Sequence, residues 1–181
     1  MGDSRTWVMD TSSYTHICRS GHPEIIEKLA PGGVVLVPSE VNHEIENGRG
    51  RYPGIPAVSS VSWAEVTVLA EEEIWTALGV KAQLGGRPEE HLGECAVIAY
   101  AYHRDMVAIL DERAAVAQAE LLGVTNRDTL WLVIEAYKVL YGRDRELTAK
   151  VVDDLLATGM YLPLDSGESL LGWAYEEGLL T

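Results

Sequence analysis

The fold class is indicated first by residues 34–38, VVLVP. This run is apolar at every position, follows the helix breaker at 31–33, PGG, and ends at a proline. A strand with one wet face alternates apolar and polar side chains, whereas a strand covered on both faces is apolar throughout. The segment therefore predicts a strand of a parallel sheet that has helices on both faces.

Strands and helices alternate on both sides of this segment. Short apolar or β-branched runs at 6–9, 57–68, 106–110 and 124–125 predict four further strands. Helical patterns cover 11–29, 40–46 with Ser39 as its N-cap, 69–78, 91–103, 114–122, 129–140, 147–157 and 169–177. This order predicts an α/β fold, a three-layer α/β/α sandwich with a central parallel sheet. We expect residues 1–145 to form that domain and residues 146–181 to form a C-terminal helical extension packed on it.

Charge and cysteine content narrow the functional classes. The 181 residues contain 28 Asp and Glu against 14 Lys and Arg, a formal net charge of −14. This charge argues against a broad surface that binds nucleic acid, so a nucleic-acid contact is expected to be local or bridged by a metal ion. The two cysteines, Cys18 and Cys95, are too few for a disulfide framework and favour a cytoplasmic location. No apolar leader and no run of about 20 apolar residues occurs, so neither export nor membrane insertion is expected.

Several reaction classes lack their motif. The sequence has no G-x-x-x-x-G-K-[ST], no G-x-S-x-G and no H-E-x-x-H, which removes support for a nucleoside triphosphatase, an α/β-hydrolase or a zinc protease. An aspartyl-phosphate enzyme would also begin at a strand-end acid, but Ser12 stands where that class needs a second acid. The histidines lack paired ligand spacing, and we interpret them as surface residues. They are His16, His22, His43, His91 and His103.

Four carboxylates are expected at one edge of the sheet. Asp10 ends the first predicted strand and Asp111 ends the fourth, and parallel strands bring such residues to the same edge. Glu94 begins the helix that leads antiparallel into the fourth strand, so it lies over that edge too. Glu44 lies in the second turn of the helix that leaves the second strand, close enough for its side chain to reach inward.

Each of these acids also has a purely structural interpretation. Asp10 and Asp111 have the side chain of a helix N-cap, and Glu94 complements the helix dipole. Glu44, between Glu40 and Glu46, fits a solvated helix face. Four like charges in one place, however, stay ionised only beside a cation. Hard oxygen ligands of this kind favour Mg²⁺ or Mn²⁺.

Four segments together resemble the PIN-domain nucleases, a prokaryotic, toxin-like subgroup in particular. They are 8–12 (VMDTS), 37–45 (VPSEVNHEI), 92–101 (LGECAVIAYA) and 109–113 (ILDER), in the family's order, and the resemblance covers roughly residues 6–140. Two positions depart from the family pattern. Cys95 stands where many members have Asp, which leaves Glu94 to serve from one residue earlier, and Glu112 replaces the second acid of a D-D pair.

The resemblance implies metal-dependent hydrolysis of RNA, as in the toxins of toxin-antitoxin pairs. The implied catalytic acids are Asp10, Glu44, Glu94 and Asp111. We expect Asp10, Glu94 and Asp111 to hold one or two Mg²⁺ or Mn²⁺ ions that activate water for attack on a phosphodiester. Glu44 would complete this shell or orient the water.

Further residues are candidates for supporting roles. Thr11, Ser12 and Glu112 adjoin the acids, although helix capping also explains the first two. The loop with Arg49, Arg51 and Tyr52 offers charge and an aromatic ring to single-stranded RNA, although an exposed Gly-Arg loop also serves solubility alone.

The expected partners are an RNA substrate, an antitoxin protein and a second copy of the chain. The rival hypothesis is an RNA- or protein-binding adaptor with a PIN-like fold and weak turnover, which the net charge and Cys95 favour.

Overall fold

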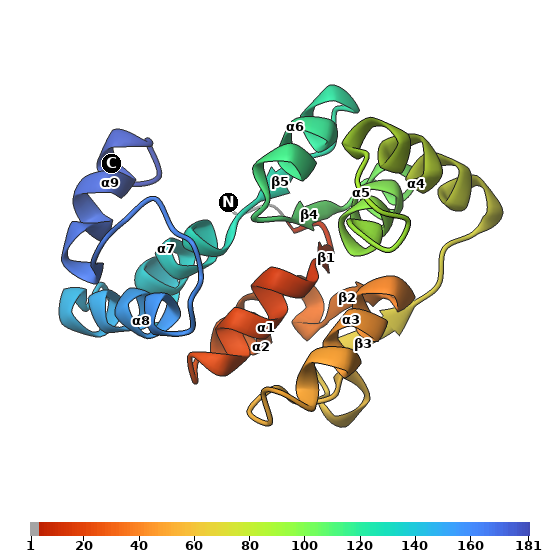
Figure 1. Cartoon of the computed structure of the whole chain (residues 1–181). Helices are drawn as coiled ribbons and strands as arrows, with labels where there is room; N and C mark the ends of the chain where they lie inside the picture. The colour runs from red at the N-terminus through yellow and green to blue at the C-terminus, as the bar shows by residue number, and fades with distance from the viewer. Residues whose placement is uncertain (1–3) are drawn as a thin grey trace.

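A computed structural model describes residues 4–181. Its centre is a five-stranded, fully parallel sheet in the order β3-β2-β1-β4-β5 (Figure 1). The strands are β1 (Trp7–Met9), β2 (Val35–Pro38), β3 (Ala64–Thr67), β4 (Val107–Ile109) and β5 (Asn126–Arg127). The chain leaves β1 toward β2 on one side and later returns to β4 on the other. Ligands of open α/β sheets bind at such a switch point, beyond the carboxyl ends of the strands.

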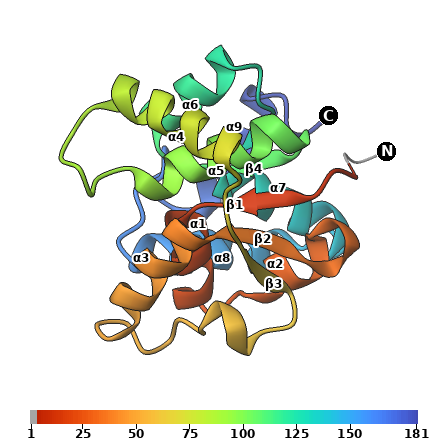
Figure 2. The same cartoon turned by 90° about the vertical axis from the view of Figure 1, so that its right-hand side faces the viewer.

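Helices cover both faces of the sheet. One group consists of α1 (Thr11–Arg19), α2 (Glu24–Leu29) and α3 (Ser39–Arg49), the other of α4 (Glu71–Leu84), α5 (Leu92–Arg104) and α6 (Arg113–Leu121). Figure 2 shows the second group above the sheet and the first group below it. The three-layer sandwich around a parallel sheet is therefore confirmed. The strand VVLVP is apolar because it is covered on both faces: Val35 and Val37 are fully buried.

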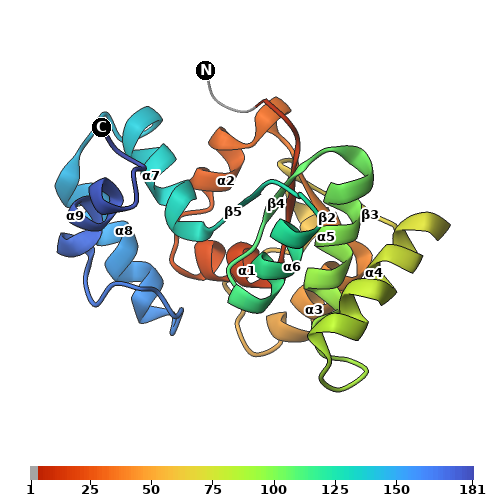
Figure 3. The same ribbon diagram turned by 90° about the horizontal axis from the view of Figure 1, so that it is seen from above.

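The last three helices pack beside the first two. They are α7 (Thr129–Val139), α8 (Arg145–Ala157) and α9 (Leu170–Glu176), and Figure 3 shows them on one side of the molecule, next to α1 and α2. Thr158 joins this group to α1, because its hydroxyl lies 2.6 Å from His16 Nδ1 and its carbonyl accepts from Arg19 Nη2 at 2.9 Å. The segment between α8 and α9 buries Met160, Leu162 and Leu164.

Several element boundaries differ from the predictions. The helix α4 runs to Leu84, beyond the expected end at Leu78. The helix expected over 11–29 is two helices, because Gly21 has a φ of +85° and Pro23 has no N–H to donate. The third strand is confined to Ala64–Thr67, after a 3-10 turn at Val58–Ser60. The fifth strand lies at Asn126–Arg127 and not at 124–125, because the Val124 N–H still bonds to Ala119 O at the end of α6.

The second predicted helix also differs at both ends. Ser39 was expected to cap it, but Ser39 is its first residue and Pro38 takes the cap position without a side-chain bond. The helix continues through Arg49, beyond the expected end at Glu46. Among residues 4–181, no helix is long and apolar enough to cross a bilayer.

Candidate active site

Asp10 and Asp111 follow neighbouring strands. Met9 of β1 is in register with Ile109 of β4, so both acids emerge side by side. Asp10 is buried, and its Oδ1 accepts from the Ser13 N–H at 2.8 Å, which makes Asp10 the N-cap of α1. Its Oδ2 accepts from the Asp111 N–H at 3.4 Å. Asp10 thus has both the structural role and the position expected of a site acid.

The Asp111 carboxylate is held by hydrogen-bond donors from two helices. Its Oδ2 accepts from Ser13 Oγ and from Thr129 Oγ1, both at 2.8 Å. Its Oδ1 accepts from the Thr129 N–H at the start of α7, at 2.9 Å. Asp111 is therefore not the cap of α6, a position that Glu112 takes. Three donors fix the orientation of this carboxylate toward the strand ends.

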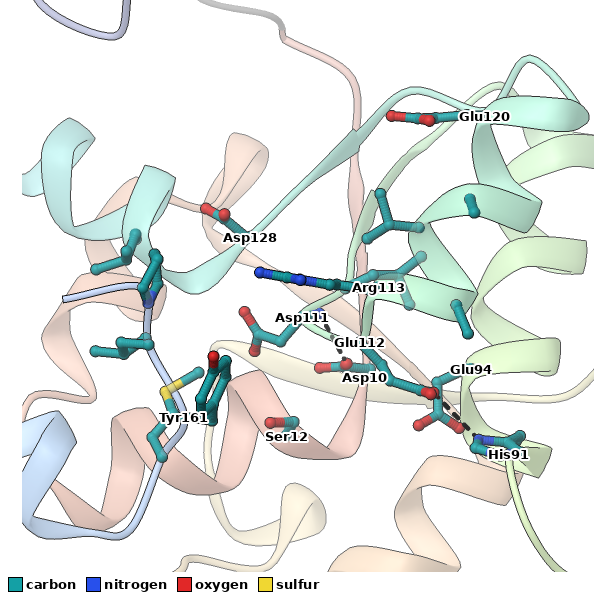
Figure 4. Close-up of a pocket in the computed structure, with 18 residues that line it drawn as sticks. Asp10, Ser12, His91, Glu94, Asp111, Glu112, Arg113, Glu120, Asp128 and Tyr161 are labelled. Atoms are coloured by element: carbon teal, nitrogen blue, oxygen red, sulfur yellow. Dashed lines mark hydrogen bonds and ion pairs between the residues drawn. The ribbon is translucent and has the colours of Figure 1, made fainter. Parts of the chain in front are cut away.

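Glu94 reaches the same cavity from the first turn of α5. Figure 4 shows Asp10, Glu94, Asp111 and Glu112 around one space, with His91 beside Glu94 and Glu112. One ligand atom each of His91, Glu94 and Glu112 lies within 4.8 Å of the others. The cavity has a volume of about 920 Å³, and most of the polar side chains that line it are acidic.

Glu44 lies behind this group, next to the start of α5. Its carboxylate accepts from Thr11 Oγ1 and, at 3.2 Å, from the Gly93 N–H. A Cβ on Gly93 would lie 2.9 Å from Glu44 Oε2, so a larger residue there would require the Glu44 carboxylate to shift. Glu44 does not line the cavity, and its hydrogen bonds go to Thr11 and to the Gly93 N–H, next to Glu94.

The crowding of carboxyl groups changes their acidity. Burial, and then the neighbouring Asp111 and Glu94 carboxylates, raise the pKa of Asp10 well above its usual value. Burial also raises the pKa of Glu94, and the carboxylates of Glu44 and Glu112 add to this effect. The raised pKa values of Asp10 and Glu94 mean that ionisation of these acids costs free energy unless a cation lies between them.

The donor set fits a divalent ion. Carboxylate oxygens are the preferred ligands of Mg²⁺ and Mn²⁺. Glu112 Oε2 is in addition a buried oxygen without a hydrogen-bond partner among residues 4–181. A buried carboxylate oxygen of this kind is costly without a donor or a cation.

The candidate supporting residues have different positions. Thr11 donates to Glu44, Ser12 lines the cavity, and Glu112 lies 3.1 Å from His91 Nδ1. Ser13, which sequence reasoning did not single out, contacts both aspartates.

The loop proposed to bind RNA lies outside the cavity lining. Arg49 belongs to α3, and its guanidinium is bonded to Glu46 Oε2 at 2.7 Å and to the Ile55 carbonyl. The Tyr52 ring is covered by Arg19, whose guanidinium carbon lies 3.8 Å from the ring centre. Arg51 is exposed. Of the three residues, Arg49 and Tyr52 are thus occupied by contacts within the protein.

Several residues that line the cavity were not among the predicted site residues. His91 precedes Glu94 by three residues, which was a signal, but its proximity depends on a left-handed turn. Asp128 follows β5 as Asp10 follows β1, and it would have been found had this strand been placed correctly. Arg113 follows the Asp111-Glu112 pair directly. Tyr161 comes from the segment after α8, and no local pattern connects it with the site.

Asp128 is a fifth strand-end acid near this group. Its Oδ1 accepts from the Trp131 N–H at 2.7 Å, which caps α7. Burial, and in addition the Asp111 carboxylate, raises the pKa of Asp128. The capping bond accounts for this acid without a metal.

Comparison with protein-family models identifies the family. The family model DUF3368, described as a PIN domain, matches residues 6–174, nearly the whole chain. A search of curated proteins finds no match.

Proposed function

Since the chain belongs to the PIN-domain family, whose fold is of the nuclease type, we propose that it is a metal-dependent endoribonuclease that hydrolyses single-stranded RNA. The observation that carries this proposal is the meeting of Asp10, Glu94 and Asp111 at the switch point of the sheet, in a cavity of about 920 Å³. These three side chains would hold Mg²⁺ or Mn²⁺. The ion, when bound, lowers the pKa of a water ligand and neutralises charge on the phosphate.

The protein residues prepare this site for the ion and the substrate. Ser13 and Thr129 orient the Asp111 carboxylate, and the Asp111 N–H orients Asp10. Glu44 is a positioning residue, because it bonds the first turn of α5 through Gly93 and so fixes Glu94. Ser12 faces the cavity and is available to donate to a phosphate oxygen.

Two further residues fit a role in substrate binding. Arg113 is the one Arg or Lys among the described residues that line the cavity, and within residues 4–181 it forms no hydrogen bond or ion pair. Tyr161 is 85% exposed and lies at the same cavity. Figure 4 shows both side chains extending from different elements toward the space beside Asp111. We propose that Arg113 binds the phosphate next to the scissile one and that a base stacks on the Tyr161 ring.

The supporting argument for a single strand is the charge distribution. A net charge of −14 opposes the broad basic surface that a duplex backbone requires. One cation and one aromatic ring at the cavity match a few unpaired nucleotides. We propose Arg49, Arg51 and Tyr52 as additional RNA contacts, for which a base would have to displace Arg19 from the ring face of Tyr52 that it covers.

The biological setting that we propose is that of a toxin in the cytoplasm. Both cysteines are buried free thiols, which suits a reducing compartment. An antitoxin and a second copy of the chain are the proposed protein partners. We also propose that residues 1–145 form the catalytic unit and 146–181 an extension, whose Met160–Pro163 segment completes the cavity wall.

The second candidate function is that of an adaptor with weak catalysis. Cys95 supports it, because this residue is buried and contributes no charge where many relatives are expected to have an acid. Exposed apolar side chains on and before α4 also suit a protein partner: Val68, Ile74, Trp75 and Leu78.

The deciding experiment is cleavage of end-labelled single-stranded RNA in Mn²⁺, Mg²⁺ or EDTA. Asp10→Asn and Asp111→Asn are the test variants, and Asp165→Asn, an exposed acid outside the cavity, is the matched control. We expect cleavage only with metal, a loss of roughly 100-fold or more in the test variants, and full activity in the control. Equal activity of wild type and both test variants would contradict the proposal. Inactivity of all proteins on RNA and DNA, with metal still bound, would favour the adaptor.

A further inference from the structure

We propose that His91, Glu94 and Glu112 form a nitrogen- and oxygen-donor cation site that takes a divalent transition-metal ion in preference to Mg²⁺. The site adjoins the oxygen-only pair Asp10 and Asp111 and shares Glu94 with it. The inference rests on the proposed function, because it specifies which ion occupies part of that active site.

The three donors are already close to the spacing of ligands around one ion. His91 Nδ1 lies 3.1 Å from Glu112 Oε2, and the ligand atoms of all three residues lie within 4.8 Å of one another. Ligands at about 2.1 Å from an ion are separated by roughly 3 to 4 Å. Small side-chain rotations therefore suffice to close the site around a cation.

The backbone at His91 is held in an unusual conformation. His91 has a φ of +61°, in the left-handed region, at the position just before α5. Its carbonyl accepts the first helical bond, from the Cys95 N–H at 3.0 Å. A left-handed residue other than glycine is uncommon, and such conformations are concentrated at functional sites. Here the turn directs the imidazole to Glu94 and Glu112 (Figure 4).

Glu112 supplies a second indication. Its Oε2 atom is buried and forms no hydrogen bond within residues 4–181, although the side chain as a whole is 40% exposed. The contact with this oxygen is the ion-pair contact of His91 Nδ1 at 3.1 Å, which lacks hydrogen-bond geometry. A cation bound between the two side chains would satisfy this oxygen.

The imidazole determines the preference between ions. Mg²⁺ takes oxygen ligands and waters in octahedral geometry, whereas imidazole nitrogen suits transition metals. Mn²⁺ accepts both ligand types and is therefore the probe. We expect Mn²⁺ to occupy both the oxygen-only pair and the His91 site, and Mg²⁺ to occupy the oxygen-only pair.

The competing explanation is a simple ion pair between protonated His91 and Glu112. Pulsed electron paramagnetic resonance separates the two, since a histidine nitrogen bound to Mn²⁺ gives a resolved ¹⁴N coupling. The test variant is His91→Asn, because Asn tolerates left-handed backbone but lacks the imidazole. Glu112→Gln is the second variant, and His103→Asn, at the opposite end of α5, is the control.

Titration calorimetry with MnCl₂ and MgCl₂ completes the test on the metal-free full chain, whose folding is checked by circular dichroism. We expect ¹⁴N coupling in wild type and His103→Asn and its loss in His91→Asn. Mn²⁺ affinity should fall roughly 10- to 100-fold in His91→Asn and Glu112→Gln, while Mg²⁺ affinity in His91→Asn stays within about twofold, because Mg²⁺ does not seek imidazole.

Absence of ¹⁴N coupling in wild type, or its persistence in His91→Asn, would overturn the inference. The proposed nuclease function would survive that result if RNA cleavage still depends on metal and Asp10. Conversely, ¹⁴N coupling in a protein that cleaves no nucleic acid would support the site and remove the nuclease function.

Discussion

At the scale of single residues, Gly93 controls the relation between Glu44 and Glu94. A Cβ at this position would lie 2.9 Å and 3.1 Å from the two Glu44 oxygens and 3.1 Å from Val41 Cγ2. We therefore predict that Gly93→Ala lowers the free energy of unfolding by roughly 1–3 kcal/mol, the cost of overpacking. It should also lower RNA cleavage, because Glu44 can no longer hold the first turn of α5.

Gly79→Ala is the matched control for this change. Gly79 also lies within a helix, α4, but a Cβ there meets nothing within 4 Å. It should raise the free energy of unfolding by roughly 0.5–1 kcal/mol, the difference in helix propensity. Urea denaturation measures both variants. Equal, stabilising effects of the two substitutions would show that Glu44 needs no close approach to α5.

The raised pKa of Asp10 leads to a prediction about the metal-free protein. A carboxyl with a raised pKa in the folded state binds its proton more tightly when folded, so stability falls as the pH rises above the usual pKa of 3.8. Asp10→Asn removes this cost and keeps a capping side chain. In EDTA at pH 7 we predict that the variant is more stable than wild type by roughly 1 kcal/mol or more.

Two further measurements test the cause of this difference. The difference in stability should shrink as the pH falls to and below the usual pKa of 3.8, because Asp10 then becomes protonated in the unfolded state as well as in the folded state. Addition of Mn²⁺ should reverse the order, since 100 times Kd adds about 2.7 kcal/mol to a protein that binds the ion. A variant that is less stable than wild type at pH 7 in EDTA would mean that the Asp10 hydrogen bonds outweigh the repulsion.

The strand-end acids could be predicted from the sequence because their position depends only on strand order. Asp10 and Asp111 follow apolar runs directly, and neighbouring parallel strands bring them together. The partners of Asp111 could not be predicted in the same way, because Ser13 and Thr129 lie 98 and 18 residues away. The position of the His91 side chain depends on the left-handed backbone conformation of this residue, which no hydrophobic pattern encodes.

At the scale of elements, apolar spacing placed α5 closely and failed for the short, polar strand β5. The helix α5 lies within one residue of its predicted bounds at each end, because its face against the sheet is continuously apolar and buried. The strand β5 has only two residues, Asn126 and Arg127, and neither is apolar. Its hydrogen bonds to β4 define it, so pattern alone placed it two residues too early.

The segment between α8 and α9 is the element through which the C-terminal residues reach the site. Met160 and Leu162 anchor it in the core, which leaves Tyr161 exposed at the cavity. We predict that Tyr161→Ala raises the KM for single-stranded RNA roughly 5- to 100-fold, the value of one base stack, and leaves Mn²⁺ affinity unchanged. Steady-state cleavage of a short RNA measures this effect.

Tyr175→Ala provides the control for Tyr161. Tyr175 is 55% exposed on α9 and does not line the active-site cavity, so its removal should leave KM unchanged. Equal KM values for the two variants would show that the exposed Tyr161 ring does not contact the substrate.

At the scale of the whole molecule, the negative net charge opposes nucleic-acid binding, whereas the fold brings the site residues together. The α/β/α architecture could be predicted from the alternation of strands and helices. The packing of α7 on α2 and of α8 on α1 could not, because it depends on contacts between distant parts of the chain. One such contact joins His22 Nε2 to Asp154 Oδ2 at 2.8 Å. That packing brings the C-terminal residues to the cavity. The net charge of −14 opposes nucleic-acid binding, so the proposed function requires the metal and Arg113 to provide most of the attraction for RNA.

This charge balance predicts an unusually weak dependence on monovalent salt. For single strands, the logarithm of affinity falls with the logarithm of salt concentration with a slope of about −0.7 for each phosphate neutralised by a basic side chain. With Arg113 as the one such contact, KM should rise at most about threefold between 50 and 200 mM KCl at constant Mn²⁺. Screening of the repulsion from the net charge of −14 acts in the opposite direction and reduces this rise further.

Arg113→Gln should abolish the remaining dependence, whereas Arg87→Gln, an exposed arginine outside the cavity, should not. A rise in KM of tenfold or more would require several phosphate contacts, and the Arg49, Arg51 and Tyr52 segment would then be the place to look for them.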